Sequence, residues 1–189
     1  MILVLEITGL EHHLYIKNMN SKNKKISKIL DKYKSSFSSN DLSSLEQLLS
    51  KDLDSAEYSL FTDGACEFDS EYKPINAGIG GIIRAKDKTL FSFSENVGIK
   101  TNNEAEYLAL IKGIDLCLKN NISKISIFAD SELVVKQITG DYKVKNERMA
   151  ALHKKTHQLL SKFNSWDINH VLRDKNTEAD DLSKQGLSK

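Results

Sequence analysis

Hydrophobic and polar positions follow regular patterns over the last two-thirds of the chain. Period-two alternation predicts five strands, at residues 58–66, 77–85, 89–97, 124–129 and 166–172. Helical spacing of apolar residues predicts four helices, at residues 104–119, 132–138, 147–163 and 178–185. The order βββαβααβα predicts an α/β fold with a mixed five-stranded sheet flanked by helices, because a helical crossover after the third strand favours parallel addition of the fourth.

The composition changes near residue 57. Residues 1–56 are polar and rich in serine and lysine, with amphipathic helices expected near 25–36 and 45–51 and one or two short strands within 1–16. We therefore expect an N-terminal extension at 1–56, of unknown role, and one α/β domain at 57–189. The extension is either a module that binds a partner or substrate, or a segment that packs on the domain.

Charge is nearly balanced overall but segregated locally. The chain has 27 basic and 26 acidic residues, yet residues 136–162 hold seven basic residues against two acidic ones. This excess indicates either a phosphate-binding face or a solvated helix face. Cys66 and Cys117 are too few for a disulfide scaffold and are not spaced as a zinc site.

No segment of the sequence predicts export or membrane insertion. The apolar start at residues 1–5 lacks a basic leader and is broken by Glu6, and no run approaches the roughly 20 apolar residues that span a bilayer. We expect a cytoplasmic protein that has no membrane partner.

Four carboxylates stand beside predicted strand ends or helix starts, namely Asp63, Glu106, Asp130 and Asp180. Such a set, gathered from distant segments, suits two divalent ions, because Mg²⁺ prefers hard oxygen ligands. Two ions about 3.5–4 Å apart can activate a water molecule and stabilise the leaving oxygen of a phosphodiester. The set therefore indicates phosphodiester hydrolysis.

Each carboxylate also has an ordinary structural explanation. Asp63 precedes a glycine, as in many turns. Glu106 would be a capping acid if Asn103 caps its helix, and Asp130 or its neighbour Ser131 would serve as a helix N-cap. Asp180 lies in a first helical turn, where acids favour the helix dipole.

The order of these motifs and their neighbours resembles the type 1 ribonuclease H family over residues 58–186. The matching segments are Thr62-Asp63-Gly64, Thr101-Asn102-Asn103 with Glu106, Asp130-Ser131 and Ala179-Asp180-Asp181-Leu182. The resemblance implies a catalytic domain that hydrolyses the RNA strand of RNA·DNA hybrids and leaves 5′-phosphate and 3′-hydroxyl ends. It implies two Mg²⁺ ions per site, with Mn²⁺ as the alternative ion.

The resemblance also implies roles for single residues. Asp63 would bridge both ions, Glu106 and Asp130 would hold the leaving-group ion, and Asp180 would help to hold the water-activating one. The implied nucleic-acid contacts are Asn102 and Asn103 in the minor groove, Thr101 and Asn146 around a DNA-strand phosphate, Gly64, Ala65 and Cys66 near the RNA ribose, and Arg173 at a phosphate.

Three departures from the family pattern qualify this reading. The loop expected at residues 67–76 is long and contains three acids. The connection before the last helix is short, with His170 expected inside the strand, and no basic handle follows residues 140–143, as in the compact subtype. We therefore expect weaker hybrid binding than in relatives with a handle. The alternatives are a nucleic-acid-binding module of the same fold with little catalysis, or a same-fold nuclease that acts on double-stranded RNA.

Overall fold

Five strands form one mixed sheet in the part of the chain that the computed structural model describes, which is residues 38, 41 and 57–189. The elements are β1 (Tyr58–Phe68), β2 (Pro74–Ala85), β3 (Lys88–Asn96), α4 (Asn102–Lys119), β4 (Lys124–Ala129), α5 (Glu132–Thr139), α6 (Glu147–Leu160), β5 (Ser165–His170), the 3₁₀ turn η2 (Arg173–Lys175) and α7 (Thr177–Leu187). The sheet order is β3-β2-β1-β4-β5. The predicted fold class and element order are confirmed. The elements expected within residues 1–56 lie outside the described residues.

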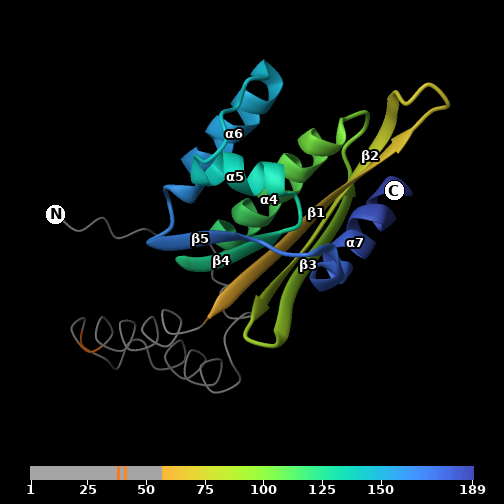
Figure 1. Cartoon of the computed structure of the whole chain (residues 1–189). Helices are drawn as coiled ribbons and strands as arrows, with labels where there is room; N and C mark the ends of the chain where they lie inside the picture. Colours follow the sequence, from red (N-terminus) through yellow and green to blue (C-terminus); the bar gives the residue numbers. More distant parts are fainter. Residues whose placement is uncertain (1–37, 39–40, 42–56) are drawn as a thin grey trace. The chain divides into compact units, whose positions relative to one another are not determined.

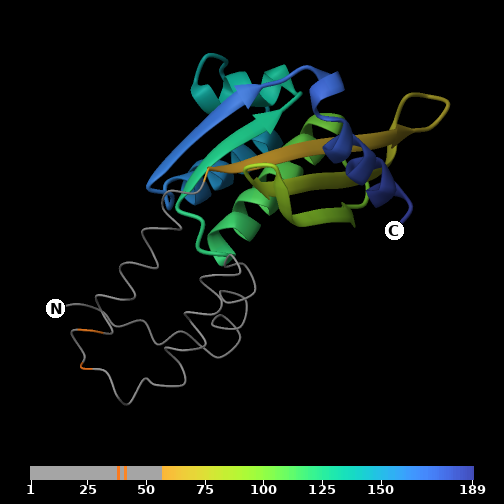
Figure 2. The same cartoon turned by 90° about the horizontal axis from the view of Figure 1, so that it is seen from below.

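Strand pairing follows from the connections. Short turns join β1, β2 and β3 into an antiparallel meander, whereas β4 and β5 run parallel to β1 because helices connect them. Figure 2 shows β4 and β5 as parallel arrows beside β1. The register brings Thr62 of β1 opposite Ala129, the last residue of β4. Asp63, the next residue of β1, and Asp130, the first residue after β4, therefore lie at the same level of the sheet on neighbouring strands.

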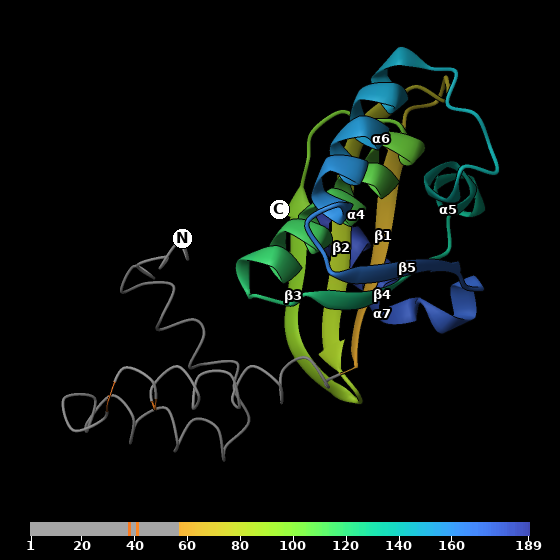
Figure 3. The same ribbon diagram turned by 90° about the vertical axis from the view of Figure 1, so that its left-hand side faces the viewer.

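Helices cover both faces of the sheet. Figures 1 and 3 show α4 and α6 side by side over one face and α7 against the other. The main core lies between the sheet and the first pair, and it includes Leu60, Tyr107, Leu110, Ile114 and Ile127, all fully buried. None of the described helices is long and apolar enough to cross a membrane.

Half of the predicted loop at residues 67–76 is strand. β1 continues to Phe68 and β2 begins at Pro74, so only a short turn remains. The Asp69 carboxylate closes this turn by accepting hydrogen bonds from the backbone N–H groups of Glu71 at 2.9 Å and Lys73 at 2.8 Å. Aspartate often organises turns in this way, and the sequence pattern alone did not reveal it.

Smaller corrections concern two element ends. His170 lies in strand β5, as predicted. The strand ends at this residue, two residues earlier than predicted, and the 3₁₀ turn η2 follows. α4 begins at Asn102 rather than at residue 104, and this difference of two residues decides the role of two glutamates.

Candidate metal and nucleic-acid site

Three of the four predicted carboxylates meet where β1, β4 and α4 come together. Asp63, Glu106 and Asp130 each offer an oxygen, and these oxygens lie within 4.8 Å of one another. The close approach of α4 depends on Gly64, because a Cβ at this position would lie 2.4 Å from the backbone nitrogen of Glu106. A glycine after Asp63 therefore lets the start of a helix come against the strand.

The start of α4 shows why Glu106 is available. Thr101, not Asn103, is the N-cap, and it forms a capping box with Glu104. The Glu104 carboxylate accepts hydrogen bonds from the Thr101 backbone N–H at 2.9 Å and from its hydroxyl at 2.7 Å. The hypothesis of an Asn103 cap with Glu106 as the capping acid is wrong, and Glu106 has no capping role.

Asp130 is likewise not a helix cap. Ser131 caps α5 by accepting a hydrogen bond from the Val134 backbone N–H at 3.4 Å. The Oδ1 atom of Asp130 is buried and has no hydrogen-bond partner among the described residues. A buried carboxylate oxygen without a donor is costly, and a cation is one of the few groups that compensate it.

Burial and mutual repulsion raise the pKa values of two carboxylates in the cluster, Asp63 and Glu106. Burial, opposed by a hydrogen bond from Ser183 and reinforced by the charges of Asp130 and Asp180, raises the pKa of Asp63 to about 6. Burial and the charges of Asp63 and Asp130 raise the pKa of Glu106 to about 9. Ionising such a group of acids needs nearby positive charge. The donor set and its electrostatics therefore fit divalent metal ions.

Asp180 stands beside this cluster and is held differently. It lies in the first turn of α7 and is buried, which alone would raise its pKa, but hydrogen bonds from Lys184 and Arg173 lower the pKa instead. The Arg173 guanidinium lies 2.6 Å from Asp180 Oδ1, and the Lys184 ammonium pairs with the other oxygen. Asp180 is not one of the three residues within 4.8 Å, and its expected role as a fourth ligand stays a prediction.

The predicted phosphate-pocket residues lie at two helix starts. Thr101 caps α4, and Asn146 caps α6 by accepting hydrogen bonds from the backbone N–H groups of Arg148 and Met149. Arg148 also reaches back to Glu104 at 3.6 Å, which links the two helix starts. Helix N-termini favour anions, so this arrangement suits a phosphate. The sequence alone did not predict that Arg148 links the two helix starts.

The remaining predicted contacts lie around the same edge. Asn102 and Asn103 are the first two residues of α4, and both side chains are exposed. Ala65 and Cys66 follow Gly64 along β1. Burial, followed by the charge of Glu67, raises the pKa of the Cys66 thiol, which donates to the Lys100 carbonyl at 3.1 Å. Cys66 is therefore not a thiolate nucleophile.

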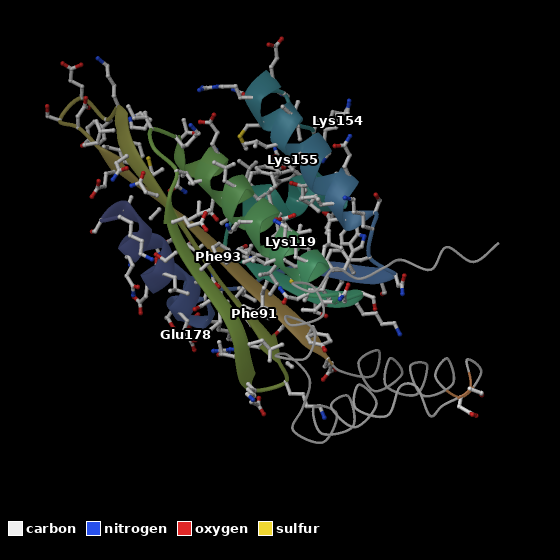
Figure 4. All side chains as sticks on the ribbon, turned by 180° about the vertical axis from the view of Figure 1, so that it is seen from behind. Phe91, Phe93, Lys119, Lys154, Lys155 and Glu178 are labelled. Atoms are coloured by element: carbon white, nitrogen blue, oxygen red, sulfur yellow. The ribbon has the colours of Figure 1, made fainter. Side chains whose placement is uncertain are left out.

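The basic stretch from residue 136 to 162 lies largely on and before α6. Figure 4 shows Lys154 and Lys155 projecting outward from this helix, and both are exposed. Thr156, next to them, is buried, so the helix turns its polar face to solvent and its other face to the core. Lys143 and Lys145 of the same stretch are also exposed and lie just before Asn146, the cap of this helix.

The fold and this carboxylate cluster define the class of ribonuclease H-like proteins, and comparison with known proteins agrees. The family described as reverse transcriptase-like matches residues 61–186. The N-terminal ribonuclease H domain of Rv2228c from Mycobacterium tuberculosis superimposes with a TM-score of 0.66 at 31% identity, covering 71% of this chain and 95% of that one. The chain belongs to the ribonuclease H family.

Two further relatives have informative descriptions. Ribonuclease HI of Halobacterium salinarum is 31% identical over 128 residues, which are 67% of this chain and 62% of that protein. LC11-RNase H1, solved in complex with an RNA/DNA hybrid, has a TM-score of 0.63 at 31% identity and is covered to 97%.

The match to curated relatives is partial. The bifunctional protein Rv2228c is 33% identical over 120 residues, so the match covers 62% of this chain and 33% of that protein. The chain thus spans a third to less than two-thirds of the length of these relatives.

Proposed function

We propose that this protein is an endoribonuclease that hydrolyses the RNA strand of RNA·DNA hybrids by two-metal-ion catalysis, leaving 5′-phosphate and 3′-hydroxyl ends. The observation that carries the proposal is the group of Asp63, Glu106 and Asp130, whose oxygens lie within 4.8 Å of one another in a ribonuclease H fold. The hybrid-bound state of the similar LC11-RNase H1 supports the substrate class.

The chain's own residues have distinct tasks in this proposal. Asp63, on the central strand of the sheet, would help to hold both ions. Glu106 and Asp130 would hold the ion on the side of the leaving 3′ oxygen, and Asp180, which pairs with Arg173 and Lys184, would help to hold the other. Bound Mg²⁺ ions, or Mn²⁺ in their place, would supply a water nucleophile and stabilise the leaving oxygen.

Recognition uses the residues around the cluster. The exposed amides of Asn102 and Asn103 meet the minor groove, where side-chain amides can donate to and accept from base and sugar edges. Thr101 and Asn146, at two linked helix starts, receive a phosphate of the DNA strand. Gly64, Ala65 and Cys66 lie along the RNA strand, close to a ribose. A phosphate contact by Arg173 is compatible with its largely exposed side chain.

Two alternatives differ from this proposal in measurable ways. A binding module of the same fold would hold the hybrid without cutting it, and the three convergent carboxylates with an unpartnered Asp130 oxygen argue against this alternative. A same-fold nuclease for double-stranded RNA would cut RNA duplexes. Both alternatives give a definite result in the same assay.

The decisive experiment presents one labelled sequence as RNA·DNA hybrid, double-stranded RNA, double-stranded DNA and single-stranded RNA. Each substrate is incubated with Mg²⁺, Mn²⁺ or EDTA, and the ends of the products are mapped. We expect metal-dependent cutting of the RNA strand of the hybrid alone. A hybrid that is bound but left intact with either metal would establish the binding module instead.

The proposal extends to the rest of the chain and to its setting. We infer that residues 57–189 form the catalytic domain, that residues 1–56 are a separate extension, and that the protein works in the cytoplasm. Cell fractionation followed by immunodetection tests the location, and truncation at residue 57 tests the domain boundary.

A further inference from the structure

We infer that Ser183 is a positioning residue for Asp63, and that its hydroxyl orients this carboxylate for metal binding. The inference rests on the proposed function and adds a residue that no sequence motif had indicated. Ser183 is fully buried on α7, and its hydroxyl donates a hydrogen bond to Oδ2 of Asp63. It lies three residues after Asp180, so one face of α7 presents both side chains toward β1.

The reach of this short side chain depends on the sheet beneath it. Gly80 of β2 pairs with Asp63 of β1, and a Cβ on Gly80 would lie 2.2 Å from the Ser183 backbone nitrogen. Because Gly80 has no side chain, α7 can lie close against the strands at this point. A hydroxyl one carbon from the helix backbone can therefore touch the Asp63 carboxylate.

A second side chain ties the start of α7 to Thr62, the residue before Asp63 in β1. Asn176, buried just before the helix, donates from Nδ2 to the Thr62 carbonyl at 3.0 Å. The Asn176 and Ser183 contacts thus hold two consecutive residues of β1, Thr62 and Asp63. Together they set the register between helix and strand, so Ser183 meets Asp63 in a defined geometry.

The hydroxyl has two acceptors, and the charged one is the stronger. Ser183 Oγ also lies 2.8 Å from the Asp180 carbonyl, one turn earlier in α7. A serine has one hydroxyl proton, and hydrogen bonds to a carboxylate are roughly twice as strong as neutral ones. With Asp63 ionised, the proton points to Asp63 and opposes its rotation away from the like charges of Glu106 and Asp130.

As a consequence, the Ser183 hydroxyl holds the Asp63 carboxylate in one orientation for metal binding. Partners behind metal ligands typically change metal affinity or activity by about 10- to 100-fold when removed. Ser183→Ala removes the donor and keeps a small side chain under Gly80. We expect Mn²⁺, titrated calorimetrically without nucleic acid, to bind about tenfold more weakly to this variant, and kcat to fall by a similar factor with little change in KM for hybrid.

Two further variants separate orientation from packing. Ser183→Cys fills the site with a somewhat larger polar group that is only a weak donor, so we expect it to resemble Ser183→Ala in Mn²⁺ affinity. Thr156→Val is the matched control, since Thr156 is fully buried and its hydroxyl donates to the Leu152 carbonyl at 2.9 Å within α6. This variant should lower Tm and leave Mn²⁺ affinity unchanged.

The outcomes distinguish the inference from the function on which it rests. Wild-type Mn²⁺ affinity in Ser183→Ala or in Ser183→Cys overturns the inference, as does an equal loss of affinity in Thr156→Val. A wild-type protein that neither binds Mn²⁺ nor cuts hybrid overturns the proposed function as well. A wild-type protein that does both, alongside an unchanged Ser183→Ala variant, overturns the inference alone.

Discussion

Thr101 and Glu104 cap helix α4 reciprocally, with the Glu104 carboxylate 2.7 Å from the Thr101 hydroxyl and 2.9 Å from its backbone nitrogen. This pairing gives different roles to two glutamates that are two residues apart, Glu104 and Glu106. Glu104 satisfies the helix terminus, whereas Glu106 joins the buried cluster with Asp63 and Asp130. The difference is testable because the two substitutions have opposite effects.

We expect Glu104→Ala and Glu106→Gln to dissociate stability from activity. Loss of a capping interaction costs about 1 kcal/mol, so Glu104→Ala should lower Tm by a few degrees while metal-dependent cleavage persists. Burial raises the pKa of Glu106 to about 9, which costs folding stability above the ordinary pKa, so Glu106→Gln should raise Tm in EDTA at neutral pH and abolish cleavage. Thermal melts and a cleavage assay on both variants decide this, and the opposite pattern would reverse the assignment.

Asp63→Asn and Asp130→Asn should each abolish cleavage and leave hybrid binding intact. Each change removes a proposed metal ligand while it preserves side-chain volume, so turnover should fall more than about 100-fold, beyond the loss seen for groups behind the ligands. Single-turnover cleavage and fluorescence anisotropy with the same hybrid measure the two properties. Asp167→Asn, exposed on β5, is the control. Turnover above about a tenth of the wild-type value in either variant contradicts the metal site.

The stability of the metal-free protein should fall as the pH rises. Burial raises the pKa of Asp63 to about 6 and that of Glu106 to about 9, above the ordinary values of 3.8 and 4.5. The stabilisation from these protons is complete below the ordinary values and is lost as the pH passes through about 6 and then about 9. Tm in EDTA should therefore decrease over this range, and Mg²⁺ should restore it most at the alkaline end.

The control for this pH dependence is Glu106→Gln, which does not titrate. Its Tm in EDTA should fall less between about pH 6 and pH 9 than that of the wild type. Equal slopes for the two proteins would show that other groups cause the dependence.

Arg173 should contribute to hybrid affinity through charge. Its side chain is 73% exposed although it pairs with Asp180, so it is accessible to a phosphate. Arg173→Ala should weaken hybrid binding and reduce the slope of log K against log salt by about one, as expected for one lost phosphate contact. An unchanged salt slope would restrict Arg173 to its contact with Asp180. Arg84→Ala, whose guanidinium pairs with Glu178, provides a comparison of equal charge.

Deleting residues 1–56 should leave a folded domain. The described core, from Leu60 to Ala179, is built from residues after 57, so circular dichroism and a cooperative melt should be retained. If the extension binds substrate, hybrid affinity should fall while kcat persists. Unchanged affinity would assign the extension to another role.

The sequence by itself determined the strand and helix order and the identity of the four acidic motifs. Period-two and helical spacing are local properties, and short motifs such as Thr62-Asp63-Gly64 specify a residue together with its immediate neighbours. The parallel placement of β4 beside β1 also followed from a general rule on helical crossovers.

Only the tertiary structure decided how these carboxylates are used. Whether Glu104 or Glu106 caps α4 depends on a start that differs by two residues, and local propensities do not resolve such boundaries. The orphaned Asp130 oxygen, the pairing of Asp180 with Arg173, and the Ser183 hydroxyl on Asp63 join segments far apart in the chain. Such contacts arise from close packing, in which Gly64 and Gly80 let helices approach the sheet, and packing is a property of the whole fold.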